Sequence, residues 1–481
     1  MTTSFYWHDY ETFGADPQRD QACQFAGQRT DLDLNPVGEP LVIYCQPHPD
    51  RLPHPEACLI TGITPQHARE HGVNEAEFIR RIHAELSAPE TCGLGYNSLR
   101  FDDEVTRNLL YRNFFDPYAR EWQNQNSRWD LIDLTRAAHA LRPDGMIWPQ
   151  DADGAPCFRL SELTAANGLA HAAAHDALSD VHASIALARL LKQRQPKLFD
   201  YLFQNRGKHA AQQLLNLGGF TPLVHVSGRY PAKKHCLAIV VALAAHPVNA
   251  NETIVYDLSQ DPTPLLTLEA EEIRVRLFTA SAELPPDAPR IPLKTVHHNK
   301  CPVLAPLSVI RKADAERLSL DLKQCDAHLQ ALKSAADLPA KLSLVFTRDY
   351  QDAPADPDLM IYSGGFFNQH DKAILNRIRD ASPEQLARLK PAADDPRLPD
   401  MLFRYRARNY PHSLSQDEQQ EWRDFCRQRL QNPEDPRRLS LAQYHALLDQ
   451  LERQAETDKT VLESLRAYAG ELRGQLEINP I

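Results

Sequence analysis

Two acidic side chains near the start of the chain have a spacing that could bind a cation. In the segment HDYETFG, Asp9 and Glu11 are two residues apart within an expected strand. Because the side chains of a strand alternate between its two faces, both carboxylates lie on the same face. Neighbouring acids repel each other and are costly to bury unless a cation lies between them. Many surface strands carry an Asp-x-Glu pair, so the pair alone is a weak signal.

Two later segments supply further groups of the same chemistry. Asp102 opens an expected helix in RFDDEVTRN, where Asp103 and Glu104 are interpreted as acids that complement the positive end of the helix. In AHDALSDV, His175 and Asp180 are five residues apart, which is about 140° around a regular helix. The two side chains therefore converge only if His175 precedes or opens the helix that contains Asp180.

Together these segments give four carboxylates and one histidine in a fixed order along the chain. Oxygen ligands suit hard divalent cations, and we expect two Mg²⁺ ions, with Mn²⁺ as the alternative. Two such ions ~3.5–4 Å apart can hold the attacking and leaving oxygens of a phosphodiester. A histidine that is free of metal can accept a proton from the attacking water. The expected chemistry is metal-dependent phosphodiester hydrolysis.

The segments around these residues resemble the DEDD exonucleases of the His-containing subgroup, and within them the bacterial exonuclease I family. The resemblance rests on HDYETFG, LITGITPQ, GYNSLRFDDEVTRN, NSRWDLIDL, FRLSELTAANG, AHDALSDV, HHNKCPVLA and LFRYRARNYP. It implies a 3′→5′ exodeoxyribonuclease that degrades single-stranded DNA processively to nucleoside 5′-monophosphates with Mg²⁺, in DNA repair and recombination.

The resemblance also implies a role for each residue of the set. Asp9, Glu11, Asp102 and Asp180 match the metal-binding carboxylates, and His175 matches the general base. Glu11, Asp102 and His175 are the expected catalytic residues, and Glu11 and His175 are also expected to contact the strand. None of the five departs from the family pattern.

The fold class that the resemblance implies has three parts. They are an α/β ribonuclease-H-like exonuclease domain at 1–190, an SH3-like β-rich domain at 196–350 and an all-α C-terminal domain at 356–481. The residues agree with this order, because β-like runs alternate with helical patterns at first and capping-box spacings, Ser415 with Glu418 and Ser440 with Gln443, open the last helices. An Asp/Pro-rich linker is expected at 351–359.

Local patterns predict individual elements. We expect strands at 5–10, 41–45, 223–226, 237–243, 253–258 and 341–347. We expect helices at 102–114, 127–141, 160–167 and 176–194, with a helical connector at 196–215.

Binding of a single strand needs cations for phosphates and flat side chains on which bases stack. Arginines and aromatic residues alternate between Arg107 and Arg142. The resemblance singles out five residues for contact with the strand, namely Arg107, Tyr118, Trp122, Arg136 and Arg159. Trp129 and Tyr111, by contrast, are interpreted as core residues.

Other basic positions stay open at this stage. Lys233 and Lys234 could contact the strand or form a solvated turn, and Arg404, Arg406 and Arg408 could bind the strand or join domains. The spacing of His297 and His298 beside a cysteine is wrong for a zinc finger.

A protein partner is implied by the resemblance alone. Arg142 and Tyr201 resemble positions that bind the acidic C-terminal tail of single-stranded-DNA-binding protein. Pro306 stands where a polar residue is expected, which weakens that expectation. We expect a monomer.

Composition sets the broad class. The 53 Lys and Arg against 64 Asp and Glu give a net charge of −11. An acidic average argues against a nucleic-acid partner, but the distribution of the charges along the chain must also be considered. Residues 201–250 contain five basic and no acidic side chains, so the average hides a basic segment. Nine scattered cysteines without a Cys-x-x-Cys pair, and an N-terminus without a basic, apolar signal segment, lead us to expect a cytoplasmic protein.

Two alternative functions remain open. The same five residues would serve an RNA 3′ exonuclease. A catalytically inactive single-strand-binding scaffold could have kept the fold, although the presence of all five residues argues against it.

Overall fold

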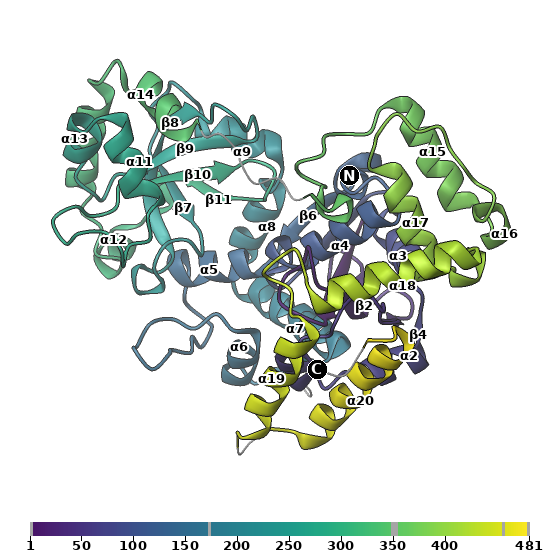
Figure 1. Cartoon of the computed structure of the whole chain (residues 1–481). Coiled ribbons are helices and arrows are strands. Elements are labelled where there is room, and N and C mark those ends of the chain that lie inside the picture. Colours follow the sequence, from purple (N-terminus) through teal and green to yellow (C-terminus); the bar gives the residue numbers. More distant parts are fainter. Residues whose placement is uncertain (1–2, 172–174, 348–354, 455–456, 479–481) are drawn as a thin grey trace. The chain divides into compact units, whose positions relative to one another are not determined.

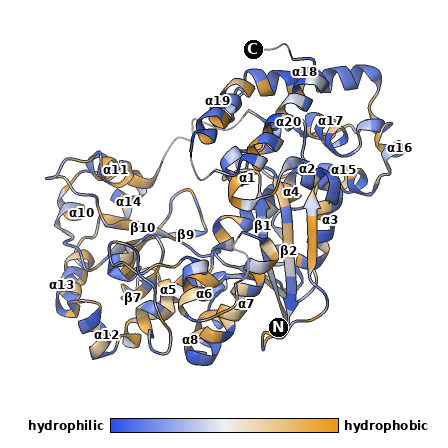
Figure 2. Ribbon diagram, turned by 90° about the horizontal axis from the view of Figure 1, so that it is seen from below, coloured by the Kyte–Doolittle hydropathy of each residue, from blue (hydrophilic) through white to orange (hydrophobic). Residues whose placement is uncertain are grey.

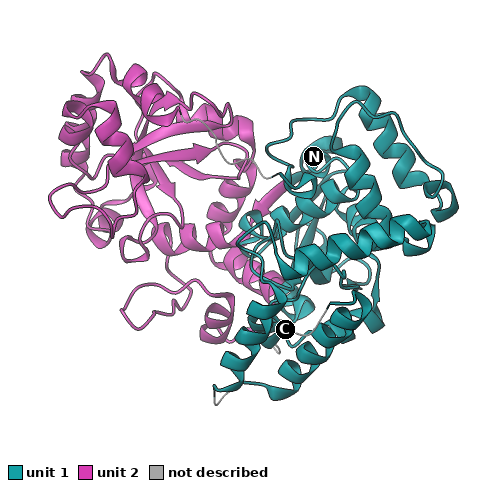
Figure 3. Ribbon diagram, in the orientation of Figure 1, with its two compact units in different colours: residues 1–127, 172–182, 352–481 teal, residues 128–171, 183–351 magenta. Residues whose placement is uncertain are grey.

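A computed structural model describes residues 3–171, 175–347, 355–454 and 457–478. The chain forms two compact units (Figure 3), each of which is described by itself. Unit 1 comprises residues 1–127, 172–182 and 352–481, and unit 2 comprises residues 128–171 and 183–351.

A mixed sheet forms the centre of the N-terminal part of unit 1 (Figure 1). Its strands in that unit are β1 (Ser4–Thr12), β2 (Ala22–Thr30), β3 (Leu41–Cys45), β4 (Gly72–Val73) and β5 (Thr91–Gly95). They lie in the order β4-β3-β2-β1-β5. β1 and β3 are each antiparallel to β2, whereas β5 is parallel to β1 and β4 is parallel to β3. The strand that carries Asp9 and Glu11 is therefore flanked on both sides, which holds its backbone in place.

Helices pack against this sheet and complete its hydrophobic core. The N-terminal helices of unit 1 are α1 (Pro55–Thr61), α2 (Pro65–His71), α3 (Glu75–Leu86) and α4 (Asp102–Arg112), with short turns η1 (Ser98–Arg100), η2 (Ala119–Glu121) and η3 (Gln123–Gln125). Tyr10 and Phe25 of the sheet pack with Phe78 and Ile82 of α3 and Leu109 of α4. This packing fixes α4 against the strand that carries the acids.

The C-terminal residues of unit 1 are helical, as expected. They form η6 (Pro357–Leu359), α15 (Gln369–Asp380), α16 (Pro383–Leu386), α17 (Leu398–Asn409), η7 (Pro411–Ser413), α18 (Gln416–Gln431), α19 (Leu441–Glu452) and α20 (Lys459–Gln475). The predicted capping boxes at Ser415 and Ser440 are both present. Figure 2 shows α18 as largely hydrophilic, and its buried residues are Trp422, Cys426 and Leu430.

These late helices share a core with the N-terminal ones. Phe13, Cys58 and Ile63 belong to the same buried cluster as Tyr444 of α19 and Leu465 of α20. The two ends of the sequence therefore build one hydrophobic core.

Unit 2 contains a five-stranded antiparallel sheet in the order β10-β9-β8-β7-β11. Its strands are β7 (Leu223–Val226), β8 (Leu237–Ala245), β9 (Glu252–Asp257), β10 (Leu293–His297) and β11 (Val303–Pro306). Helices α10 (Thr263–Thr267), α11 (Ala270–Phe278), α12 (Lys312–Arg317), α13 (Leu322–Lys333) and α14 (Leu338–Phe346) follow, with turns η4 (Ala232–Lys234) and η5 (Leu307–Val309). Residues of β8 and β9 pack with α11, α13 and α14 in one cluster.

The remaining elements lie between η3 and β7 in the sequence. They are β6 (Ser127–Asp130), α5 (Leu131–Leu141), α6 (Leu160–Ala166), α7 (Ala177–Arg194), α8 (Pro196–Gln204) and α9 (Lys208–Leu215). Trp129 and Tyr111 are buried core residues, which confirms their interpretation.

Two local predictions are wrong. Residues 127–130 form β6 before α5 begins, so the predicted helix at 127–141 starts too early. Residues 341–347, predicted as a strand, belong almost entirely to α14, which has a proline in its first turn and buries Leu342, Val345 and Phe346 on one face. A short apolar run is compatible with either state until the surrounding packing is known.

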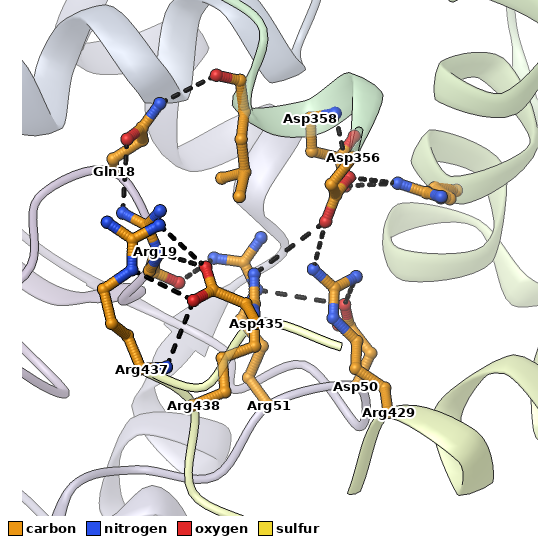
Figure 4. Close-up of polar contacts among 12 residues, drawn as sticks. Gln18, Arg19, Asp50, Arg51, Asp356, Asp358, Arg429, Asp435, Arg437 and Arg438 are labelled. Atoms are coloured by element: carbon orange, nitrogen blue, oxygen red, sulfur yellow. Dashed lines mark hydrogen bonds and ion pairs between the residues drawn. The ribbon is translucent and has the colours of Figure 1, made fainter. Parts of the chain in front are cut away.

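Arginines of α17 and α18 are paired with acids that are buried or half-buried. Arg408 Nη2 lies 2.8 Å from Asp50 Oδ2 and 2.7 Å from Asp358 Oδ2. Arg429 contacts Asp50 and Asp356 (Figure 4). Arg404 contacts Asp356. Arg404 and Arg408 therefore join the C-terminal helices to the N-terminal residues and to residues 356–358. Residues 351–354 of the expected linker lie outside the described residues.

The described residues include no helix with the length and apolar character that crossing a bilayer requires. All nine cysteines are buried and free.

Candidate metal centre

Three carboxylates converge in unit 1. Asp9 and Glu11 of β1 and Asp180 of α7 each offer an oxygen, and these oxygens all lie within 4.8 Å of one another. Glu11 is buried, and the other two are half-buried. The structure thus brings together residues that are up to 171 positions apart in the sequence.

The path of β1 explains the direction of the first two carboxylates. Asp9 lies opposite Ala26 and Glu11 opposite Gln24, and the register shifts between Glu11 and Thr12. The irregularity at the end of the strand is where a bulge can redirect a side chain. On the other side, a Cβ at Gly95 of β5 would lie 2.5 Å from the carbonyl oxygen of His8. Only glycine permits this close approach, which fixes the backbone immediately before Asp9.

Asp102 begins α4, as predicted, and is tied to β1. Its Oδ1 accepts a hydrogen bond of 3.0 Å from the backbone N–H of Tyr10, which lies between Asp9 and Glu11. Thr106 donates to the Asp102 carbonyl and contacts the Tyr10 hydroxyl. Asp102 is buried and close enough to the acids of β1 to raise their pKa values. The fourth carboxylate therefore adjoins the group of three.

His175 and Asp180 have the arrangement that their spacing required. His175 lies in a turn before α7 with a positive φ of 67° and is exposed, while Asp180 lies in the first turn of the helix. A non-glycine residue at positive φ is uncommon and points to a functional or structural constraint. The turn allows both residues to belong to one site despite the 140° that a continuous helix would impose.

The acids of β1 are electrostatically unfavourable without a cation. Burial, followed by the charges of Asp102, Glu11 and Asp180, raises the pKa of Asp9 well above its ordinary value. Burial and the charges of Asp180 and Asp102 raise the pKa of Glu11 to about 8. An all-oxygen donor set that repels itself in this way fits a hard divalent cation, whose charge would restore the ionised carboxylates.

Sequence reasoning missed one member of this electrostatic environment. Asp176 also raises the pKa values of Asp9 and Glu11. Its Oδ1 accepts the backbone N–H of Ser179 at 2.9 Å, so it caps the start of α7. The signal was present in AHDALSDV, where an acid precedes a helix.

Two of the residues predicted to contact the strand, Arg107 and Tyr118, lie against each other in unit 1. The Arg107 guanidinium pairs with Glu121 and Glu104, at 2.7 Å in each case, and lies 5.4 Å from the centre of the Tyr118 ring. Trp122 is 64% exposed, so its ring is available to a base. Arg107 itself is buried and has little free hydrogen-bonding capacity.

Phe366 is an aromatic residue that the sequence analysis did not identify. It is 86% exposed, and its ring centre lies 6.1 Å from that of Tyr118. The only available signal was an apolar pair after two glycines in SGGFFNQ.

The other predicted contact residues belong to unit 2. Arg136 pairs with Asp133 at 2.8 Å, and Arg159 is exposed. Arg142 donates to the Val309 carbonyl and lies 3.5 Å from Asp314, and the Tyr201 hydroxyl donates to the Leu304 carbonyl. Lys233 and Lys234 are exposed in η4.

Three family models match the chain. An exonuclease model covers residues 6–188, a model of the exonuclease I SH3-like domain covers 206–348, and a model of the exonuclease I C-terminal domain covers 355–472.

Curated relatives match over nearly the full length. Exodeoxyribonuclease I of Escherichia coli is 46% identical over 474 residues, which is 98% of each chain. Exodeoxyribonuclease I of Haemophilus influenzae is 45% identical, covering 89% of this chain and 91% of the relative.

Solved structures agree in fold. A moderately thermophilic exonuclease I from Methylocaldum szegediense is 53% identical with a TM-score of 0.94, covering 98% and 99% of the two chains. The E. coli enzyme in complex with a dA16 oligonucleotide is 46% identical with a TM-score of 0.93, covering 98% and 100%. A zinc-bound form of the E. coli complex with single-stranded DNA has the same TM-score, at 45% identity with the same coverage.

Proposed function

The chain belongs to the exonuclease I family, and on this basis we propose that it is a 3′→5′ exodeoxyribonuclease. It degrades single-stranded DNA processively to nucleoside 5′-monophosphates by phosphodiester hydrolysis and acts in DNA repair and recombination. The observation that carries the proposal is the convergence of Asp9, Glu11 and Asp180 within 4.8 Å, beside Asp102.

The donor set fits divalent metal ions, and two Mg²⁺ ions are the proposed cofactor. Asp9, Glu11, Asp102 and Asp180 would hold them. When bound, the metal supplies positive charge that stabilises the phosphate oxygens during displacement. Mn²⁺ has the same preference for oxygen ligands and is the alternative.

The protein's own residues prepare the nucleophile and the strand. His175, in the exposed turn before α7, accepts a proton from the attacking water. Glu11 and Asp102 complete the catalytic set. Tyr118 and Trp122 provide faces on which bases stack, with Phe366 beside Tyr118.

The arginines have different parts in this proposal. Because Glu104 and Glu121 occupy the Arg107 guanidinium, Arg107 contributes by positioning the Tyr118 ring that it faces. Arg136 and the exposed Arg159 are proposed to contact the strand directly.

A protein partner and a location complete the proposal. A solved structure that is 45% identical to this chain, with a TM-score of 0.89, contains SSB and exonuclease I in complex with an inhibitor. We propose that Arg142 and Tyr201 bind the acidic tail of the corresponding single-stranded-DNA-binding protein, and that the enzyme is a cytoplasmic monomer. If so, Arg142→Ala should weaken binding of the tail peptide without changing hydrolysis of naked DNA.

The central test uses a 3′-labelled single strand. Asp9→Asn should lower the rate in Mg²⁺ by about 1000-fold, because loss of a ligand removes several kcal/mol of transition-state stabilisation. Binding of the strand in chelator should persist. Asp326→Asn, at an exposed position of α13, is the matched control and should keep the full rate.

The same assay distinguishes the alternatives. Matched DNA and RNA oligonucleotides separate a deoxyribonuclease from an RNA 3′ exonuclease by their initial rates. Strand binding without any release of mononucleotide from the unmodified protein would instead identify a scaffold. A full rate in Asp9→Asn would overturn the metal assignment.

A further inference from the structure

A cavity of about 310 Å³ lies in unit 1 between α3, the turns η2 and η3, and α15. None of the proposed metal ligands or strand-contact residues lines it. Its volume is at the lower end of the range of small-molecule sites, about 300–1,000 Å³. Two arginines, Arg120 and Arg379, are among the residues that line it.

Arg120 reaches the cavity from a buried position. It is 3% exposed, and its Nη2 contacts Asp103 Oδ1 at 2.6 Å. Its Nε has no hydrogen-bond partner among the described residues. A buried guanidinium with unused donor capacity is costly unless an acceptor is supplied.

Arg379 approaches from α15 without a carboxylate partner among the described residues. Its Nη1 donates to the Phe114 carbonyl at 3.1 Å, and its Nη2 donates to Asn376 at 2.6 Å. The guanidinium lies 4.6 Å from the centre of the Phe115 ring. Neither of these oxygens carries a full negative charge, so the charge of Arg379 is not neutralised by them.

The other titratable groups on the wall are His83 and Asp116. Burial, then Arg379 and Arg120, lower the pKa of His83 to about 4, so the imidazole is neutral near pH 7. Asp116 is the acid on the wall, and its Oδ1 accepts the backbone N–H groups of Tyr118 and Ala119. Asp103 pairs with Arg120, and Asp116 already has backbone partners, so Arg379 is the guanidinium on the wall that no described carboxylate contacts.

We propose that this cavity binds a phosphate monoester, with the phosphoryl group held by Arg379 and Arg120. Guanidinium groups suit phosphate because their N–H donors match its oxygens. The volume exceeds what a bare phosphate needs and leaves room for a nucleoside next to Phe115 and His83, whose ring centres are 4.6 Å apart. A nucleoside 5′-monophosphate is therefore the favoured ligand, and inorganic phosphate is the other source of the same chemistry.

The cavity adjoins, in the sequence, the residues proposed to contact the strand. Arg120 lies between Tyr118 and Trp122 in the sequence, and its partner Asp103 follows Asp102. A bound phosphate would share the Arg120 guanidinium with Asp103. The site is nevertheless distinct from the metal centre, so its occupancy can be measured without turnover.

Calorimetric titration of the full chain in chelator tests the proposal. Deoxyadenosine 5′-monophosphate should bind saturably, inorganic phosphate more weakly, and deoxyadenosine not at all. Arg379→Gln should weaken nucleotide binding at least about tenfold, because it removes a charge-assisted contact to the phosphoryl group. Arg377→Gln, an equal change of charge at an exposed position of the same helix, should bind like the unmodified protein.

Each outcome decides the assignment. Equal binding of phosphate and nucleotide, both lost in Arg379→Gln, would support the phosphate site and remove the nucleoside from it. Absence of saturable binding, equal binding of deoxyadenosine, or an affinity unchanged in Arg379→Gln would overturn the proposal. Circular dichroism melting of Arg379→Gln, together with the behaviour of Arg379→Lys, separates loss of a contact from loss of fold. These measurements use no hydrolysis, so their failure is distinguishable from failure of the proposed nuclease function.

Discussion

At the scale of single residues, the proposed site combines acids that need a cation with a histidine in an unusual backbone conformation. Without a cation, the carboxylates of Asp9 and Glu11 are destabilised by burial and by the charges of nearby acids, which raise their pKa values. His175 has a φ of 67°, a region that asparagine tolerates better than most residues. A substitution at this position must therefore remove the imidazole without straining the backbone of the turn.

His175→Asn is the variant that does so. We expect a loss of about 10²–10⁴-fold in kcat, the usual contribution of a positioned acid–base group. Mn²⁺ binding, followed by electron paramagnetic resonance, should be unchanged, and added imidazole should restore part of the rate because the position is exposed. A variant that retains full activity would remove His175 from the mechanism.

Trp122 is the residue at which base stacking can be tested most directly, because its ring is exposed. Trp122→Ala should weaken binding of single-stranded DNA in chelator by roughly 5- to 150-fold, as expected for the loss of one stacked base. Trp122→Phe keeps a flat ring and should recover most of the affinity. Equal affinities of the alanine variant and the unmodified protein would exclude stacking at this position.

At the scale of elements, the sequence predicted the helices and strands whose signals lie in neighbouring residues, and it missed those that depend on packing with distant residues. The aromatic run of β1 and the starts of α4 and α7 follow from neighbouring residues, and these elements carry the acids. β2 (ACQFAGQRT) and β5 (TCGLG) were not predicted, because they lack runs of β-branched residues and owe their burial to the strands beside them. The error at 341–347 has the same origin, since only packing against β8 and β9 distinguishes a buried helix face from a strand.

The candidate site shows the same limit. Spacing placed Asp9 and Glu11 on one face, but it could not show that Arg107 is occupied by Glu104 and Glu121 or that Phe366 lies beside Tyr118. The sequence also could not distinguish whether Arg404 and Arg408 bind phosphates of the strand or buried carboxylates, because arginine suits both kinds of anion.

The close approach of β5 to β1 yields a prediction for this scale. In Gly95→Ala the new Cβ would collide with the His8 carbonyl, so β1 must shift next to Asp9. Because small displacements of reacting groups are costly, we expect kcat to fall by about tenfold or more while strand binding is retained. Gly470→Ala in α20, where the Cβ meets no atom within 4 Å, is the control and should keep full activity. An unchanged kcat in Gly95→Ala would show that the backbone of β1 can shift at His8 without displacing the Asp9 carboxylate.

At the scale of the whole molecule, buried charge links distant parts of unit 1. Burial alone would raise the pKa of Asp50, but Arg408, Arg429 and Arg51 lower it well below its ordinary value, and arginines lower that of Asp358 in the same way. His48 is buried near them with a pKa lowered to about 4. Ionised acids and a neutral imidazole are therefore required by the fold.

Acid should destabilise unit 1 for this reason. A carboxyl group whose pKa is lowered by folding contributes stability above its unfolded value, about 3.9 for Asp, and this stability is lost as the pH falls below that value. His48 adds a loss that begins near its unfolded value of about 6.5. Protonation of Asp9 and Glu11 has the opposite effect, because folding raises their pKa values. The thermal unfolding midpoint should therefore fall most steeply below pH 4, where the lowered pKa values of Asp50 and Asp358 dominate.

Arg408→Met provides the internal comparison. It should be less stable at pH 7 by about 3–5 kcal/mol, because it leaves buried carboxylates without their main partner, and it should lose less on acidification. Arg473→Met, at an exposed position of α20, should behave like the unmodified protein. A midpoint that is constant between pH 5 and pH 3 would contradict this account of the network.

The core shared by the two ends of the sequence has a consequence for synthesis on the ribosome. Phe13, Cys58 and Ile63 are translated long before residues of the same buried cluster such as Tyr444 and Leu465. Such long-range contacts form slowly and leave apolar surface exposed until the later helices have been made. A messenger truncated before α19 would therefore yield an aggregation-prone fragment, so the proposed metal-binding carboxylates reach their final support only after α19 and α20 have been made.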